Sequence, residues 1–235
     1  RSISGRLLPE RRFAVDGGRP LTDDSGFTAG GSGFSRAGRG SAGVMRVIAG
    51  KYRGRRLTGP QGLEIRPTGD RLKESLFNIL APVLPGAVVL DAFGGTGAIG
   101  IEALSRGARE VVFIEKSPAG CRLIRRNLDG CGVTTGYRIL QQDIFTALRF
   151  LARQGFRADI LYFDPPYAWD PYGDLLGLAF GRGLAREAAS VIVEHRRRTP
   201  PPESGEGFAR TRLVRQGDHC LSFYAAAAPP APALP

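Results

Sequence analysis

The sequence is poor in the residues that form metal sites, disulfide frameworks and histidine-dependent active sites. Its 235 residues include three cysteines, Cys121, Cys131 and Cys220, and two histidines, His195 and His219. The cysteines are odd in number and lack zinc-binding spacing, so neither a disulfide framework nor a structural metal is indicated. Two histidines disfavour a histidine-based triad. We predict no metal site.

Long apolar runs and acidic residues are also scarce. No window approaches the roughly 18 apolar residues of a membrane span, and the N-terminus lacks the apolar core of a signal peptide. We therefore expect a cytoplasmic protein. Lys and Arg outnumber Asp and Glu by 33 to 22, which gives a formal net charge of +11. This excess favours a polyanionic partner, with nucleic acid first and an anionic membrane surface as the alternative.

Both ends of the chain lack a pattern that could form a core. Residues 1–44 are rich in Gly, Ser and Arg, and residues 226–235 are rich in Ala and Pro, so we predict two disordered tails. Met45, the only methionine, precedes every structured pattern and is a candidate translation start. Between the tails we predict a small basic hairpin over residues 45–68 and a main domain over residues 69–225.

The region between the tails alternates strand-like apolar runs with amphipathic, helix-like segments. The predicted strands are residues 87–93, 110–116, 136–143, 158–164 and 189–195, followed by a hairpin around the turn at 216–218. The order predicts an α/β, Rossmann-like fold: a mostly parallel, seven-stranded sheet with an antiparallel C-terminal hairpin. In the helix-like segment 116–130, Ser117 can cap the start, Pro118 fits the first position and Gly130 can end the helix.

The segment VVLDAFGGTGAIGIEAL places a glycine-rich turn between a strand that ends at Asp91 and a helix. Gly95, Gly97 and Gly100 match the dinucleotide-binding pattern, and Glu115 ends the next strand at the offset of a ribose-binding acid. A nucleotide-dependent oxidoreductase and a purely structural turn both remain open. However, the carboxylate of Asp91 would repel a pyrophosphate, whereas it suits a cofactor with a cationic amino-acid end such as S-adenosylmethionine.

The run DILYFDPPY ends a buried strand with Asp164, Pro165, Pro166 and Tyr167. In a doubly wound sheet this strand lies beside the first, so the two motifs should face one cleft. The prolines end the strand and leave their carbonyls as acceptors. Asp164 and the Pro165 carbonyl can hold the two N–H groups of an exocyclic amine, and Tyr167 can stack on a flipped base. A strand-ending turn with a buried tyrosine is the alternative.

From Met45 to about Tyr224, the sequence resembles the RsmD family of class I methyltransferases. The similar segments are MRVIAGKYRGRRL, IRPTGDRLKESLFNIL, VLDAFGGTGAIGIEALSRGA, FIEKS, DPPY and GDHCLSFY. The first two are the specific ones, because the glycine turn and DPPY recur in many amino-methylating enzymes. The resemblance implies an S-adenosylmethionine-dependent enzyme that methylates the exocyclic N2 of one guanine in 16S ribosomal RNA.

The resemblance also implies roles for individual residues. Those that would line the methionine end of the cofactor are Asp91, Phe93, Gly95 and Gly97. Glu115 would bind the ribose and Asp143 the adenine amine, while Arg66 and Thr68 belong to a lid that spans residues 66–71. The target-base site would be Asp164, Pro165, Pro166 and Tyr167. Gly69 and Gly94 stand where the family usually has threonine and alanine, and both changes should loosen their loops.

A basic stretch precedes the main domain. The residues that we expect to contact RNA phosphates are Arg46, Lys51, Arg53, Arg55 and Arg56, and the stretch continues with Arg66, Arg71 and Lys73. A solvated charged face is the alternative reading. Residues 67–80 should form a helix with Leu72, Leu76, Phe77 and Leu80 turned inward. Glu194 should end the fifth strand inside the cleft, and residues 196–198 either add a phosphate contact or are simply surface.

Three functions remain open at this point. The first is methylation of guanine N2 in 16S ribosomal RNA, with the small ribosomal subunit or its assembly intermediate as the partner, a monomeric enzyme and no membrane partner. The second is methylation of adenine N6 in DNA, which DPPY would serve equally well. The third is RNA binding by a catalytically inactive methyltransferase scaffold.

A chain that starts at Met45 should fold and methylate as well as the full chain, because residues 1–44 have no core pattern. The melting temperature and the methyl transfer rate of the two forms should be compared. A clear loss of either on truncation would show that residues 1–44 pack against the domain or contribute to RNA binding.

Overall fold

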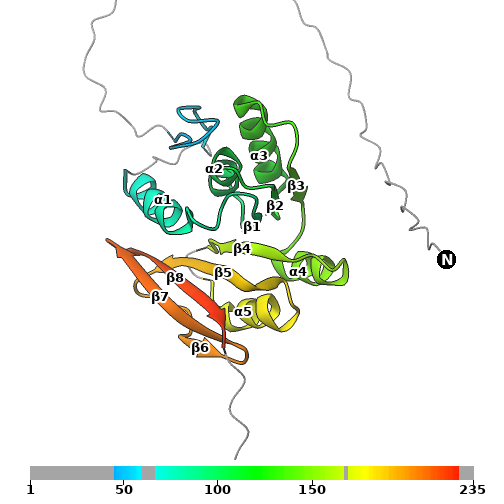
Figure 1. The fold of residues 1–235 in the computed structure, drawn as a ribbon, viewed down its shortest axis with the longest axis vertical. Helices are drawn as coiled ribbons and strands as arrows, with labels where there is room; N and C mark the ends of the chain where they lie inside the picture. The colour runs from blue at the N-terminus through cyan, green and yellow to red at the C-terminus, as the bar shows by residue number, and fades with distance from the viewer. Residues whose placement is uncertain (1–44, 60–66, 167–168, 228–235) are drawn as a thin grey trace, which may run out of the picture. The chain divides into compact units, whose positions relative to one another are not determined.

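The computed structural model describes residues 45–59, 67–166 and 169–227, with the side chains of 67–70 left aside. Over these ranges one sheet of eight strands has the order β3-β2-β1-β4-β5-β8-β7-β6 (Figure 1). The strands are β1 (Val88–Ala92), β2 (Glu110–Ile114), β3 (Tyr137–Leu140), β4 (Ala158–Phe163), β5 (Ala185–Arg196), β6 (Ser204–Gly205), β7 (Phe208–Gln216) and β8 (His219–Ala226). The helices are α1 (Pro67–Leu80), α2 (Ala98–Ser105), α3 (Pro118–Cys131), α4 (Ile144–Arg153) and α5 (Tyr172–Gly181). No helix in the described ranges is long and apolar enough to cross a membrane.

The sheet confirms the mostly parallel α/β fold with an antiparallel C-terminal hairpin. Strands β1 to β5 are parallel, and β8 and β7 follow in antiparallel pairing. The number of strands is eight because Ser204 and Gly205 pair with the start of β7, a contact too short to leave an apolar pattern in the sequence. The two predicted tails, 1–44 and most of 226–235, lie outside the described residues, although β8 extends to Ala226.

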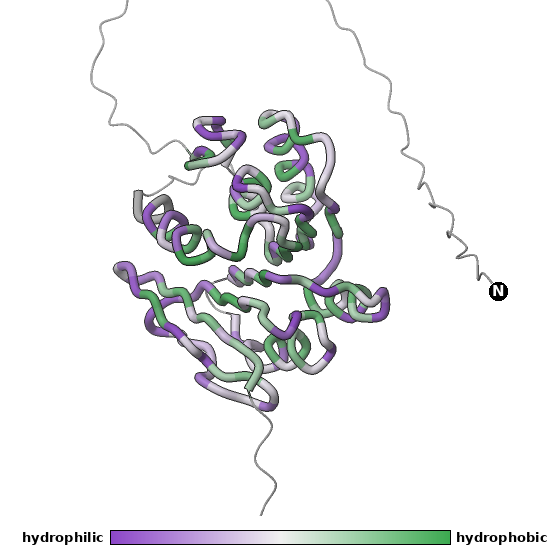
Figure 2. The backbone as a smooth tube through the Cα atoms, in the orientation of Figure 1, coloured by the Kyte–Doolittle hydropathy of each residue, from purple (hydrophilic) through white to green (hydrophobic). Residues whose placement is uncertain are grey.

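The two faces of the sheet are covered by different helices. Alternate side chains such as Val89 and Phe113 pack against α1, α2 and α3, whereas Leu90 and Val112 pack against α4 and α5. Figure 2 shows hydrophobic residues gathered on the strands and on the helix sides that face them. The predicted inward residues of α1, Leu72, Leu76, Phe77 and Leu80, are all buried. Because the central strands are buried on both faces, they read as continuous apolar runs.

Helix α3 confirms two of its three predicted boundary residues. The Ser117 hydroxyl accepts a hydrogen bond from the backbone N–H of Gly120 at 3.2 Å, and Pro118 is the first helical residue. The prediction for Gly130 is wrong, because it lies inside the helix. The helix continues to the buried Cys131, and Gly132 takes the left-handed conformation at its end, with φ of 75°.

The described part of the basic N-terminal segment, residues 45–58, forms a small hairpin, called here the N-terminal hairpin. The backbone N–H of Val47 donates to the carbonyl of Arg55 at 3.0 Å, and that of Leu57 donates to Met45 at 2.8 Å. The side chains of Val47 and Leu57 are buried in the core. One side of the hairpin therefore packs on the domain, as the sequence pattern indicated.

The buried carboxylate of Glu102 on α2 holds this hairpin by its backbone. Its two oxygens accept hydrogen bonds from the backbone N–H groups of Ile48 at 2.7 Å and Ala49 at 2.9 Å. Arg106 Nε donates to the same carboxylate at 2.7 Å, and Lys73 Nζ lies 3.7 Å from it. Two cations and two N–H groups thus compensate a carboxylate that has no solvent exposure.

Lys73 therefore does not belong to the RNA-facing surface that the sequence suggested. Its side chain is buried, and its Nζ donates to the backbone carbonyl of Arg46 at 2.8 Å. The composition of the stretch indicated a basic segment but could not show that α1 turns this lysine inward, next to Leu72.

Gly50 allows the hairpin to approach α2 closely. It has φ of 83°, and a Cβ at this position would lie 1.9 Å from the Ser105 carbonyl oxygen. That carbonyl accepts a hydrogen bond from the N–H of Lys51 at 2.7 Å, and the Ser105 hydroxyl accepts one from Tyr52 at 2.9 Å. A side chain at position 50 would displace these contacts.

Gly50→Ala should loosen the N-terminal hairpin, and Gly54→Ala provides the matched control. Gly54 has φ of 82°, but nothing lies within 4 Å of its would-be Cβ. Both variants carry the cost of a left-handed alanine, about 1–2 kcal/mol, whereas only Gly50→Ala adds the clash. Hydrogen exchange at the amides of Ile48 and Ala49 should accelerate more in Gly50→Ala. Equal exchange in the two variants would contradict the proposed close approach.

Candidate active site

The two sequence motifs meet where the strand order reverses, between β1 and β4. Asp91 pairs with Tyr162 and Ala92 with Phe163, so the glycine turn after β1 and the DPP segment after β4 leave the sheet side by side. This juxtaposition confirms that both motifs face one cleft. Ligands of open α/β sheets bind at such a switch point.

The turn after β1 needs its glycines for two different reasons. Gly95 and Gly97 have φ of 54° and 75°, and Gly97 caps the start of α2. Gly100 has an ordinary φ, but a Cβ there would lie 2.2 Å from the Phe113 ring, so it allows α2 to pack tightly on β2. Phe93 also has a positive φ, 63°, which is rare for an aromatic residue and marks a constrained site.

Asp91 is a buried carboxylate at the inner wall of the cleft. It is 2% exposed, and its Oδ2 accepts a hydrogen bond from the N–H of Gly100 at 2.8 Å. Burial raises the pKa of Asp91 to about 7, the Gly100 N–H opposes this shift, and the charge of Glu115 adds to it. The carboxylate lines a cavity of about 330 Å³ together with Phe93, Gly95 and Asp164.

Glu115 and Asp143 line a second cavity, of about 500 Å³. Glu115 Oε2 accepts from the N–H of Gly95 at 3.0 Å and Oε1 from that of Ser117 at 2.7 Å, so this carboxylate joins the glycine turn to the end of β2. Asp143 caps α4 by accepting from the N–H of Phe145 at 3.0 Å. Each carboxylate keeps further acceptor positions for hydroxyl or amine groups of a ligand.

Three aromatic residues form another wall of the second cavity, and the sequence singled out only one of them, Phe93. The Trp169 ring lies 5.5 Å from that of Phe93 and 6.0 Å from that of Phe145, centroid to centroid. All three line the cavity. The three residues follow three different strands, so only the fold brings them together. Such a wall suits a planar ring.

A second group of acidic residues lies beside the DPP segment. Asp164 and Glu194 line both cavities, which therefore adjoin each other. Asp164 is exposed at the wall of the cleft, although protein surrounds it elsewhere. The loss of water around the carboxylate raises the pKa of Asp164 well above its usual value, and the charges of Glu194 and Asp91 add to this shift. Glu194 accepts a hydrogen bond from the Tyr162 hydroxyl and lies 3.1 Å from His219 Nδ1.

The structure places the remaining predicted residues as follows. Pro165 and Pro166 line the second cavity, whereas Tyr167 lies outside the described residues, as does Arg66. Thr68 is in the first turn of α1, and its side chain is not described.

All the residues predicted to bind RNA are exposed on the N-terminal hairpin: Arg46, Lys51, Arg53, Arg55 and Arg56. Arg196 instead contacts His219 and Asp218, while Arg197 and Arg198 are exposed.

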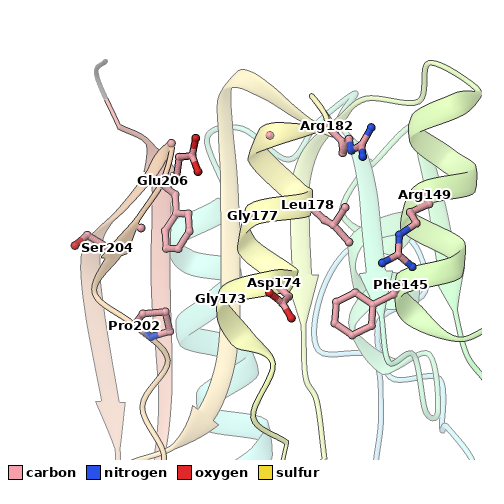
Figure 3. Close-up of a pocket in the computed structure, with 14 residues that line it drawn as sticks. Phe145, Arg149, Gly173, Asp174, Gly177, Leu178, Arg182, Pro202, Ser204 and Glu206 are labelled. Carbon is pink, nitrogen blue, oxygen red and sulfur yellow. The ribbon is translucent and has the colours of Figure 1, made fainter. Parts of the chain in front are cut away.

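A larger hollow, of about 1000 Å³, lies along α5 and contains none of these candidates. In Figure 3, Gly173 and Gly177 face it from α5, Arg149 from α4, and Ser204 and Glu206 from the segment before β7. It lacks the glycine turn and the group of carboxylates. The two adjoining cavities are therefore the candidate active site.

A family model described as Conserved hypothetical protein 95 matches residues 45–225. The chain belongs to the RsmD family. Two relatives are named Ribosomal RNA small subunit methyltransferase D. The one from Escherichia coli K12 is 37% identical over 153 residues, 65% of this chain and 75% of the relative. The one from Haemophilus influenzae is 32% identical over 159 residues, 67% of this chain and 82% of the relative.

Solved structures agree with this family assignment. A protein from Escherichia coli has a TM-score of 0.68 at 31% identity, covering 80% of this chain and all of its own. A hypothetical protein from Thermus thermophilus has a TM-score of 0.67 at 29% identity, covering 78% of this chain and all of its own. The Rossmann-like methyltransferase fold expected for an RsmD family member is confirmed.

S-adenosylmethionine is the cofactor of this RsmD family member, and the site fits it. The acidic wall suits a molecule that carries a positive charge on both its amino group and its sulfonium. The glycine turn gives its backbone close access, and the aromatic wall offers a face for adenine. No group of His, Cys, Asp and Glu that could hold a metal is found among the described residues.

S-adenosylmethionine should bind this RsmD family member more weakly as the pH falls below 7. The pKa of Asp91 is about 7 without ligand, and a cationic ligand needs the ionised form. The affinity should therefore drop by up to about tenfold for each pH unit below that pKa and level off above it. Calorimetric titration between about pH 6 and pH 8 measures this. Asp91→Asn should bind weakly throughout with a flatter profile, and a flat wild-type profile would contradict the role of Asp91.

Proposed function

We propose that this chain transfers a methyl group from S-adenosylmethionine to the exocyclic N2 of a guanine in 16S ribosomal RNA, in the cytoplasm. The observation that supports this most directly is the position of the Asp164 carboxylate. It lies at the end of β4, in the wall of both cavities and across the switch point from the glycine turn. In this proposal an acceptor for the amine would lie next to the site of the methyl donor.

The cofactor would lie across the two cavities. Asp91, Phe93, Gly95 and Gly97 would hold its methionine end, Glu115 its ribose and Asp143 its adenine amine. Arg66 and Thr68 would belong to the predicted lid. Bound in this way, S-adenosylmethionine supplies an electrophilic methyl group on a positively charged sulfur. The positive charge of the ligand favours the ionised forms of Asp91 and Asp164, which their surroundings disfavour in its absence.

The target amine would be held by Asp164 and the Pro165 carbonyl. The lone pair of an exocyclic amine is delocalised into its ring, so the amine is a poor nucleophile. Two acceptors on its N–H groups would favour the positive charge that develops on nitrogen as the N–C bond forms and the bond between the methyl carbon and sulfur breaks. Pro166 keeps the segment rigid, and Tyr167 would stack on the flipped base. Because Asp164 is exposed at the cleft wall, a base can reach it from solvent.

The RNA would lie along the N-terminal hairpin. Its exposed cations offer phosphate contacts, while Glu102 fixes the backbone that carries them. The relatives named Ribosomal RNA small subunit methyltransferase D support small-subunit RNA as the substrate. We infer that the chain acts as a monomer on the small ribosomal subunit or its assembly intermediate.

Nucleoside analysis tests this proposal directly. Small ribosomal subunits from cells that lack the modification should be incubated with the protein and labelled S-adenosylmethionine, and the product should be N2-methylguanosine.

Asp164→Ala should bind the cofactor nearly as well as wild type and form little N2-methylguanosine, because the substitution removes the residue that would hold the amine and leaves the methyl donor site intact.

Other outcomes would overturn the proposal in distinct ways. Label on adenine N6 of DNA would assign the second function considered from the sequence. Label on a ring carbon would contradict the amine-holding role of Asp164. No cofactor binding would favour an inactive scaffold.

A further inference from the structure

Glu194 lies directly beside the amine-holding residue. In the parallel pairing of β4 with β5, Tyr162 is opposite Ile192 and Phe163 is opposite Val193. The same register continued by one residue places Asp164 opposite Glu194, on strands that lie about 4.8 Å apart. Both side chains line both cavities. Glu194 therefore faces whatever ring Asp164 holds by its amine.

Glu194 is held as a hydrogen-bond acceptor. The Tyr162 hydroxyl donates to its Oε2, and burial followed by the charge of Glu194 raises the pKa of Tyr162 well above its usual value, so the phenol keeps its proton. His219 Nδ1 lies 3.1 Å from Oε1 of Glu194. Because Arg196 has only donors and its Nη1 lies 2.8 Å from His219 Nε2, Nε2 is the acceptor and Nδ1 carries the proton.

These contacts fix the position of the carboxylate and stabilise its negative charge. The Glu194 side chain remains 17% exposed, which leaves acceptor positions open to the cleft. The Tyr162 hydroxyl and His219 Nδ1 donate to the Glu194 carboxylate from the protein side, so its remaining acceptor positions can take a hydrogen bond from a donor on a bound base. It therefore distinguishes a ring N–H from a ring nitrogen with a lone pair.

Purines differ at the ring position next to the amine. In guanine the neighbour of the N2 amine on the Watson–Crick edge is N1–H, a donor. In adenine the neighbour of the N6 amine is N1 with a lone pair, an acceptor. An acceptor beside Asp164 would hydrogen-bond with the first and repel the second, as expected for reading a flipped base at its Watson–Crick edge.

We propose that Glu194 accepts the N1–H of the target guanine and thereby selects guanine over purines that lack this proton. The inference rests on the proposed function, since it adds the base-reading residue to the site of N2 methylation. Glu194, Asp164 and the Pro165 carbonyl then match, acceptor for donor, the N1–H and the two N–H groups of the amine. Tyr162, His219 and Arg196 are positioning residues, because they act on the base only through Glu194.

The test compares guanosine with 2-aminopurine riboside, which keeps the N2 amine and its place on the ribose but has neither N1–H nor the 6-oxo group; the Glu194→Gln variant then assigns the difference to N1. Once the methylated guanosine is mapped, small-subunit RNA with either base at that position can be assembled from ligated fragments. Wild type should methylate guanosine with kcat/KM about tenfold to a hundredfold higher, the range for one hydrogen bond to a charged group. Glu194→Gln should lower the guanosine rate and bring the ratio close to one, because the amide NH₂ can donate to the unprotonated N1.

Two variants act as controls. Glu187→Gln removes an exposed glutamate from the same strand and should keep the wild-type ratio. Glu194→Asp keeps the carboxylate on a side chain that is one methylene shorter. It should therefore methylate guanosine more slowly than wild type and still prefer guanosine to 2-aminopurine riboside. Melting temperature and S-adenosylmethionine affinity, measured for each variant, verify that the fold and the cofactor site are intact.

The outcomes separate the two proposals. Equal wild-type rates on guanosine and 2-aminopurine, or an unchanged preference in Glu194→Gln, would overturn the role of Glu194 and leave N2 methylation standing. No methylation of guanosine by wild type would overturn the proposed function itself. If Glu194→Gln fails to fold, Glu194→Asp provides the test. The proposal requires a negative charge at this position and not a side chain of glutamate length, so loss of the preference for guanosine in Glu194→Asp would overturn it.

Discussion

Electrostatic repulsion among Asp91, Asp164 and Glu194 is the constraint on which this site depends. All three carboxylates line one cavity, next to the carboxyl ends of adjacent strands. The protein relieves part of the repulsion with the N–H of Gly100, the hydroxyl of Tyr162 and the ring of His219. Burial, with the charge of Glu115 added, raises the pKa of Asp91, and burial followed by the charges of Glu194 and Asp91 raises that of Asp164. A ligand with positive charge would complete the balance, so this group of carboxylates suits a cationic methyl donor.

A separate buried charge connects this site to the N-terminal hairpin and its exposed cations. Glu102 is on α2, the helix that follows the glycine turn, and the same carboxylate fixes the backbone of the N-terminal hairpin. Asn127 on α3 adds to this attachment, since its side chain bonds the backbone of Thr58 on the hairpin and that of Thr96 in the turn. The N-terminal hairpin and the glycine turn are therefore joined through α2 and α3 by side-chain hydrogen bonds.

The sequence predicted the site residues that stand at the ends of strands, where the local pattern marks both the element and the ligand site. Asp91, the glycines after it and Asp164 stand at strand ends, and a strand end in this fold is a ligand site, so the pattern alone predicted the cleft. Trp169 and His219 escaped prediction because their neighbours come from distant elements. Lys73 and Gly130 were misread for a related reason: a composition or a single glycine does not reveal which way a helix turns or how far it continues. Only packing decides that.

The attachment of the N-terminal hairpin through its own backbone has a consequence for how the protein can evolve. The peptide groups of the hairpin form hydrogen bonds with the side chains of Glu102, Ser105 and Asn127. In the described residues, these hydrogen bonds do not involve an arginine or lysine side chain of the hairpin. The basic residues can thus be exchanged, added or lost without weakening the attachment. Substitutions that change the charge of the hairpin surface are therefore independent of those that would loosen its attachment to the domain.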